Sequence, residues 1–187
     1  MKKELTLSSA LGNIFWGYLL IYTNINLGRL DILPDWLGYL LIVETLPLLA
    51  KTEPSAMLLQ SLGKGLALWE GTSWVLTILG VAMDGQVWNI LAIIAAIADL
   101  YFHFQFLTDL AAAAKEAELS LGKQLLFLRN LRTVIITIAS LPVDWENWYG
   151  AAMVLGVLAV LVHLALCLDL RSMRKEMEAR EKPEAPE

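Results

Sequence analysis

The chain has 187 residues, of which 57% are apolar, and it contains seven tryptophans. This apolar share exceeds the roughly 45 to 50% of an ordinary soluble domain, so the composition predicts a membrane protein. A net charge of −5 without a basic patch gives no reason to expect nucleic acid as a partner, and the single cysteine, Cys167, excludes a disulfide framework within one chain.

The first apolar stretch follows a basic start, Met1-Lys2-Lys3, and carries no charge from Leu5 to Gly28. It lacks a cleavage site of the small-x-small type, which a signal peptide would have. We therefore expect a first transmembrane helix at 7–25.

A polar turn follows this stretch and leads into a second apolar one. Pro34 disfavours helix immediately before it, and Asp35 is suited to cap a helix that begins after it. Trp36 and Tyr39 are typical of the membrane interface. The pattern predicts a tight external turn and a second span at 36–50.

This turn also carries a resemblance. The segment from Asp31 to Tyr39, DILPDWLGY, resembles a segment of small, uncharacterised multi-pass membrane proteins of Gram-positive bacteria. The resemblance implies a location in the bacterial cell membrane and brings no activity with it.

Four further apolar stretches complete the chain. They predict helices at 65–83, 87–110, 124–142 and 147–170, followed by a charged cytoplasmic tail at 171–187. The end of this tail, from Lys182 onward, has the composition of a disordered segment.

The last two hairpins repeat each other at an offset of 60 residues. Between positions 76–118 and 136–178, 11 of 43 residues are identical, with no gap. The polar and aromatic matches are Thr77/Thr137, Asp84/Asp144, Trp88/Trp148, His103/His163, Asp109/Asp169, Lys115/Lys175, Glu116/Glu176 and Glu118/Glu178. Because apolar bias does not produce matches of this kind, the pattern predicts an internal duplication.

Together these stretches predict an all-α fold of six transmembrane helices in three hairpins. The three external turns contain one basic residue, Arg29, while the other 13 of the 14 Lys and Arg lie on or near the opposite side. Since basic residues concentrate on the cytoplasmic side of a membrane protein, both termini are expected in the cytoplasm.

Several ionisable residues lie inside the predicted spans at similar depths. These residues are Glu44, Glu70, Asp99, His103, Arg129, Arg132 and His163. At 1.5 Å per helical residue, they lie about 9 to 15 Å from the cytoplasmic flanks. Because a lone charge near mid-membrane costs about 2.5 to 3.5 kcal/mol, we expect them to form one polar layer.

Asp99 and His103 are one helical turn apart and project to the same face. They could serve as a proton relay or as half of a cation site, or they could form a hydrogen bond that only shelters two polar groups. Two ligands on one helix do not make a closed metal site, so no metal or other cofactor is expected. Glu70 is a possible ion-pair partner for Arg129 or Arg132, although an arginine near the end of a span can also reach the interface unaided.

Five polar residues crowd the first external turn. They are Asn24, Asn26, Arg29, Asp31 and Asp35. They could form a mouth in which Arg29 meets a carboxylate or phosphate of a small solute. Alternatively, Arg29 pairs with a neighbouring aspartate and the segment is only a turn.

Two hypotheses follow for the function. The sequence has no HExxH, GxSxG, P-loop or paired cysteines, so an enzyme is not expected. The first hypothesis is a small-solute or ion transporter, or a transporter subunit, with the polar layer on the pathway; six spans in 187 residues also resemble the substrate-binding subunits of energy-coupling-factor vitamin transporters. The alternative is a non-catalytic scaffold or regulator that acts through helix contacts. Besides the lipid bilayer, expected partners are another membrane protein or a second copy of the chain.

Overall fold

The computed structural model describes residues 6–23, 26–27, 30–31 and 33–181, and these residues are mostly helical. The helices are α1 (Leu7–Tyr22), α2 (Asp35–Val43), α3 (Leu46–Leu49), η1 (Pro54–Met57), α4 (Leu58–Ile78), α5 (Gln86–Glu116), α6 (Gly122–Ala139) and α7 (Tyr149–Glu181). Two short strands, β1 (Asn26–Leu27) and β2 (Leu30–Asp31), pair antiparallel in the turn between α1 and α2. The predicted all-α class is confirmed.

The second predicted helix, 36–50, is broken into α2 and α3. Pro47 lies in the first turn of α3, where it has no N–H to donate to the preceding turn. Just before this proline, the backbone N–H and the hydroxyl of Thr45 both donate to the carbonyl of Ile42, at 2.9 and 2.7 Å, in a turn that is tighter than an α-helix. The chain therefore starts a new helix at Leu46.

The third predicted helix, 65–83, is shifted toward the N-terminus, because α4 begins at Leu58 and ends at Ile78. Gly80 has a φ of +69°, which glycine adopts without strain. Its N–H donates to the carbonyl of Thr77 at 3.1 Å, and Val81 N–H donates to Leu76 at 2.9 Å. This pair of bonds closes the helix in a Schellman motif.

The last helix continues well beyond the predicted end of its span. We expected a helix at 147–170 and a separate tail, whereas α7 runs unbroken to Glu181. Met173 is completely buried in this extension, so residues 171–181 are part of the packed structure. Residues 182–187, expected to be disordered, lie outside the described residues.

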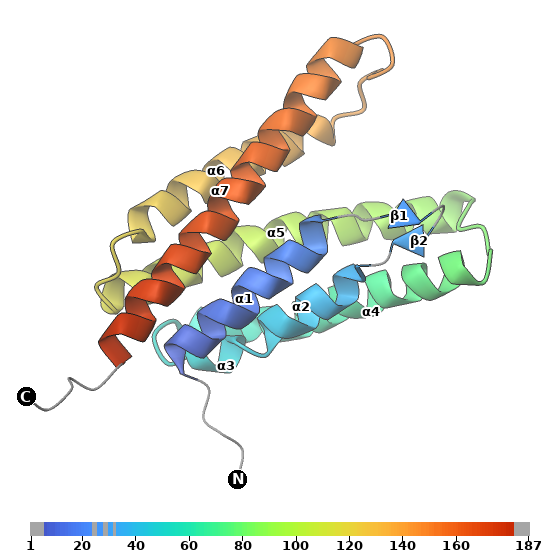
Figure 1. The fold of residues 1–187 in the computed structure, drawn as a ribbon. Helices are drawn as coiled ribbons and strands as arrows, with labels where there is room; N and C mark the ends of the chain where they lie inside the picture. The colour runs from blue at the N-terminus through green and yellow to red at the C-terminus, as the bar shows by residue number, and fades with distance from the viewer. Residues whose placement is uncertain (1–5, 24–25, 28–29, 32, 182–187) are drawn as a thin grey trace, which may run out of the picture.

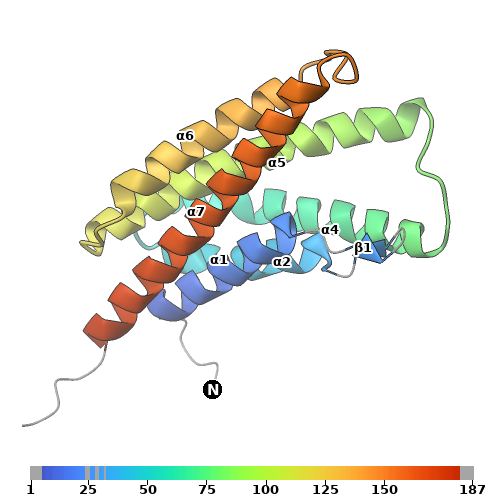
Figure 2. The same cartoon turned by 45° about the horizontal axis from the view of Figure 1, so that its top comes forward.

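The six main helices of the described chain form a closed ring. Along the ring each helix packs against the next, in the order α1, α2, α4, α5, α6, α7 and back to α1. Figures 1 and 2 show the turns β1–β2, α4–α5 and α6–α7 near one end, and the described chain ends near the other. Toward the turns, the α6–α7 hairpin diverges from the α4–α5 hairpin (Figure 1).

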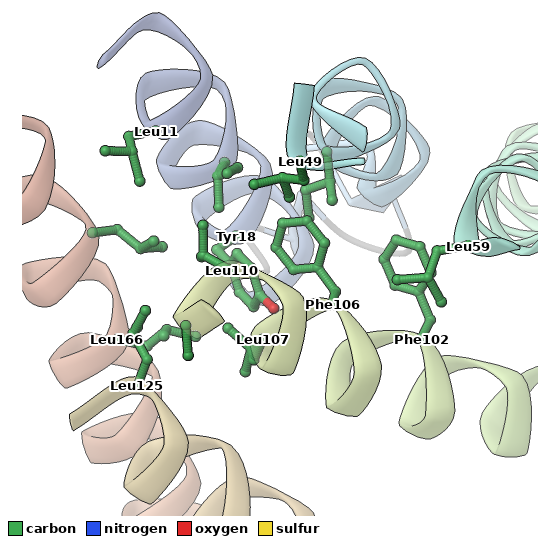
Figure 3. Close-up of a cluster of buried hydrophobic side chains, with 14 of the residues drawn as sticks. Leu11, Tyr18, Leu49, Leu59, Phe102, Phe106, Leu107, Leu110, Leu125 and Leu166 are labelled. Carbon is green, nitrogen blue, oxygen red and sulfur yellow. The ribbon is translucent and has the colours of Figure 1, made fainter. Parts of the chain in front are cut away.

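The interior of the ring is filled by side chains from α1 to α7, as Figure 3 shows. The largest fully buried ones include Tyr18, Phe102 and Phe106. Glycines let some backbones approach closely: a Cβ on Gly38 would lie 2.5 Å from the carbonyl oxygen of Gly17. We call residues 7–22, 35–70, 99–135 and 162–181, which contain all of these contacts, the packed layer.

The remaining parts of the two long hairpins differ sharply from the packed layer. We call them the arms, residues 71–98 and 136–161, and neither contains a buried residue. Large apolar side chains are exposed there, for example Ile93 at 60% and Val157 at 54%. Water-soluble proteins do not expose apolar surface over such a length.

Two helices of the described chain, α5 and α7, are long and apolar enough to cross a membrane. A core helix of a soluble protein can be equally long and apolar, but it is mostly buried. Here only 22% of the most apolar stretch of α5, and 17% of the most apolar stretch of α7, are buried inside the protein. This favours membrane association. The predicted total of six spans stays a prediction, since α1 has 16 residues and α2 has nine.

Candidate functional site

The centre of the candidate site is the carboxylate of Asp99, on α5 at the boundary between arm and packed layer. The hydroxyl of Tyr39 donates to its Oδ1 at 2.5 Å, and Nε2 of His103 lies 3.0 Å from the same oxygen. Nη2 of Arg132 lies 3.5 Å from Oδ2. His103 is fully buried, whereas the Asp99 side chain keeps 26% exposure. The charged centre is therefore buried on one side and open on the other.

Three tyrosines surround these charged groups. The Tyr18 hydroxyl lies 3.0 Å from Nδ1 of His103, so it donates to that nitrogen when Nε2 carries the imidazole proton. Arg132 Nη2 donates to the hydroxyl of Tyr22, and its guanidinium lies over the Tyr22 ring, 5.0 Å from the centroid. The tyrosine hydroxyls thus link α1 and α2 to the polar groups of α5 and α6.

His163 joins the group from α7. Its ring centroid lies 4.8 Å from that of Tyr22, and its Nε2 lies 3.5 Å from the sulfur of Cys167. We call this set the Asp99 cluster; its members are Tyr18, Tyr22, Tyr39, Asp99, His103, Arg132 and His163. Its linked hydroxyl, imidazole and carboxylate groups can both hold a polar ligand and pass protons among themselves.

Four members of the predicted polar layer, Asp99, His103, Arg132 and His163, come together in this cluster; the other three do not. Glu44 is exposed at the end of α2. Arg129 donates to the Thr108 hydroxyl at 2.7 Å and lies over the Phe104 ring, 4.3 Å from its centroid. Glu70 is half-buried on α4, and the ion pair considered between it and either arginine does not form. The predicted layer is therefore reduced to one compact cluster, to which α1, α2, α5, α6 and α7 all contribute.

The predicted external mouth is described only in part. The side chains of Asn24, Asn26, Arg29 and Asp31 lie outside the described residues. Asp35 is half-buried and is the first residue of α2, while Pro34 occupies the cap position, so the predicted capping of this helix by Asp35 is wrong. A carboxylate is nevertheless favourable in the first turn of a helix.

The three tyrosines of the cluster were not among the site residues predicted from the sequence. Tyr39 was expected at the membrane interface, which is wrong, because it is 3% exposed and bonded to Asp99. One signal was available: Tyr18 and Tyr22 are one turn apart in a span without charges. A buried tyrosine hydroxyl needs a hydrogen-bond partner, so this pair pointed toward polar groups on another helix.

A second polar group joins helix ends at the opposite end of the ring from the turns. The last turn of α7 brings Oε2 of Glu181 to 2.5 Å from the Ser8 hydroxyl, at the start of α1. Arg180 donates to the carbonyls of Ala117 and Glu118, at 2.6 and 3.0 Å, just after α5. An acid thus lies at a helix N-terminus and a base at a helix C-terminus, the arrangement that helix dipoles favour. We call these contacts the C-terminal clasp.

Glu176 extends the clasp to the turn between α5 and α6. The backbone N–H and the hydroxyl of Ser120 donate to its Oε2, at 3.3 and 3.1 Å. These donors, the backbone N–H first, hold the pKa of the Glu176 carboxyl below its ordinary value.

Metal binding gains no geometric support from the described part of the chain, which contains no group of three or more His, Cys, Asp or Glu side chains placed to hold an ion. Comparisons with protein-family models, curated proteins and solved structures find no match to this chain.

Proposed function

We propose that this chain is a multi-pass protein of the bacterial cell membrane, with six membrane-embedded helices and both termini in the cytoplasm. The exposed apolar arms support this proposal, because lipid is the solvent in which such surfaces are stable. The distribution of Lys and Arg supports the orientation. The short helices α1 and α2 satisfy most of their backbone groups by hydrogen bonds within each helix, as a membrane-embedded segment must, and they pack against neighbours in the ring.

We further propose that the Asp99 cluster is the solute-binding or ion-binding site of a small transporter or transporter subunit. One observation carries this proposal: the Asp99 carboxylate, although it is paired with the nearly buried Arg132, keeps 26% exposure. Ionisable groups at membrane depth are costly, and their usual role is on a solute or proton pathway.

A scaffold or regulator is the second candidate. The observation that favours it is the degree to which the cluster partners itself, since Tyr18, Tyr22 and Tyr39 all bond to charged or imidazole groups of the same chain. A closed network of this kind can fix the packing of helices without any ligand.

Thiol labelling from outside intact cells separates these proposals. In a Cys167→Ala background, Asp99→Cys should react with a membrane-impermeant methanethiosulfonate, because a transport site must be wet. Ile93→Cys, which is 60% exposed on the same helix, should not react, because lipid surrounds it. An unreactive thiol at position 99 would favour the scaffold. A reactive thiol at position 93 would contradict the membrane proposal itself.

A further inference from the structure

The turn between α5 and α6 borders a pocket lined by two lysines. The pocket holds about 380 Å³, and its lining includes Lys115, in the last turn of α5, and Lys123, in the first turn of α6. Both side chains are exposed, and neither forms an ion pair within the described chain. Glu118 is the one acid among the described lining residues, so two lysines and one glutamate give a net charge of +1. The pocket therefore favours an anionic ligand.

Contacts of the C-terminal clasp fix the turn that forms one wall of this pocket. Arg180 donates to the carbonyls of Ala117 and Glu118, and Glu176 accepts two hydrogen bonds from Ser120. Glu118 and Ser120 both belong to the lining. Arg180 and Glu176 also pair with each other at 2.8 Å, so these two charged groups of α7 are already in use. The pocket is preformed, which lowers the entropic cost of binding a ligand.

The α6 side of the pocket continues away from the turn as a surface that is both apolar and cationic. Leu126, which lines the pocket, is 36% exposed, and Phe127, one helical turn after Lys123, is 62% exposed. Arg129 follows Leu126 at the i+3 position, about 9 Å along the helix from Lys123. All its hydrogen bonds to described residues go to neutral groups. A third cation of this surface thus lacks an acidic partner in the described chain.

We propose that this pocket binds an anionic phospholipid of the cytoplasmic leaflet, with the phosphate between Lys115 and Lys123 and the acyl chains along Leu126 and Phe127. The inference rests on the proposed function, because the α5–α6 turn meets cytoplasmic head groups only in the proposed orientation. Basic pockets between helices on this side of a membrane are suited to anionic head groups. The exposed apolar side chains beside the lysines favour a lipid over a soluble anion. The bound phosphate would also offset part of the charge of Arg129.

The test measures binding of radiolabelled dioctanoyl phosphatidylglycerol to the purified full-length protein in a neutral detergent, by scintillation proximity. The competitors are unlabelled phosphatidylglycerol, phosphatidylcholine with the same acyl chains, and inorganic phosphate. Lys115→Gln combined with Lys123→Gln removes both cations, and the fold accepts these changes because both side chains are exposed and bond to no described residue.

Lys64→Gln combined with Lys175→Gln is the matched control. Both lysines are exposed, neither forms an ion pair within the described chain, and neither lines the pocket. Both also lie on the proposed cytoplasmic side, and the net charge changes by the same amount as in the Lys115 and Lys123 variant. The comparison therefore separates a local site from general attraction between charges.

We expect unlabelled phosphatidylglycerol to compete about tenfold better than phosphatidylcholine. The Lys115 and Lys123 variant should bind phosphatidylglycerol about tenfold more weakly, and the Lys64 and Lys175 variant should differ from the unchanged protein by less than about twofold. Equal competition by the two lipids, or equal losses in the two double variants, would overturn the inference. Displacement of the lipid by millimolar inorganic phosphate would overturn it as well, because the ligand would then be a soluble anion.

This experiment fails separately from the labelling test of the proposed function. Selective lipid binding combined with an unreactive thiol at position 99 would uphold the lipid site and overturn transport. A reactive thiol at position 99 without selective lipid binding would overturn the lipid site alone.

Discussion

The packed layer and the arms are built from the same helices, yet they are stabilised in different ways. Helices α4, α5, α6 and α7 run through both regions. In the packed layer, apolar side chains from all the helices fill the ring, and glycines such as Gly38 and Gly63 bring helices into close contact. In the arms no residue is buried, although the residues are just as apolar.

This difference indicates that the apolar side chains of one helix are accommodated in two different environments. Close packing of side chains stabilises the packed layer, as it does in a soluble core. In the arms only a few residues, such as Ala98, Leu155 and Ala159, pack against the core, so an apolar solvent is the remaining way to accommodate the other apolar side chains. The Asp99 cluster lies at the boundary between the two regions, where polar groups can be held by the protein on one side and remain accessible on the other.

The largest expected effect comes from placing a charge on an arm. Ile93→Arg should cost about 3 kcal/mol of membrane insertion, because arginine replaces an apolar residue in the hydrocarbon. The measurement is the share of protein that stays in carbonate-washed membranes. Leu58→Arg is the control, since Leu58 is 77% exposed at the start of α4, on the side that we propose faces the cytoplasm. Equal behaviour of both variants would mean that water, and not lipid, surrounds the arms.

The next effect tests close packing in the other region. Gly38→Ala should destabilise the protein by about 2 to 3 kcal/mol, because the new methyl meets the Gly17 carbonyl at 2.5 Å and must push α1 from α2. Gly156→Ala, in an arm, should be neutral or stabilise by up to about 1 kcal/mol, since alanine favours helix. Thermal unfolding followed by tryptophan fluorescence measures both. A comparable loss at the two sites would remove the distinction between the regions.

A smaller effect is expected at the boundary. Asp99→Asn leaves Arg132 without its counter-charge, and we expect a loss of about 2 kcal/mol, less than for a fully buried pair because Asp99 is partly exposed. Adding Arg132→Gln should restore part of the loss. Asp84→Asn, exposed in the turn before α5, should leave unfolding unchanged. Strict additivity of the two changes would show that Asp99 and Arg132 are not coupled.

The smallest effect concerns the C-terminal clasp. Ser8→Ala removes the hydroxyl that donates to Glu181 and should cost about 1 kcal/mol, the usual contribution of one hydrogen bond. Faster hydrogen exchange at the end of α7 should accompany the loss. Ser61→Ala, on the exposed side of α4, serves as the control. Unchanged exchange in Ser8→Ala would mean that the clasp does not hold the last turn of α7.

Most of the helical segments could be predicted from the sequence. Runs of apolar residues, and the residues that end a helix, determine local structure through their sequence neighbours. The break at Pro47 and the motif at Gly80 also have local causes, although the predicted bounds at 36–50 and 65–83 did not include them. The continuation of α7 to Glu181 was missed because charged residues favour a solvated tail. Contacts of Met173 and Glu181 with other helices override that preference.

The sequence by itself determined that the chain is helical, that its apolar residues exceed what a soluble core needs, and that Asp99 and His103 share one face, since each of these depends on composition or spacing along one helix. Only the tertiary structure decided which polar groups meet. Arg132 joins Asp99 while Arg129 turns to Thr108, and Tyr39 lies inside the ring. Depth along a helix can be counted from the sequence, but the direction in which each helix turns its faces depends on how all six pack.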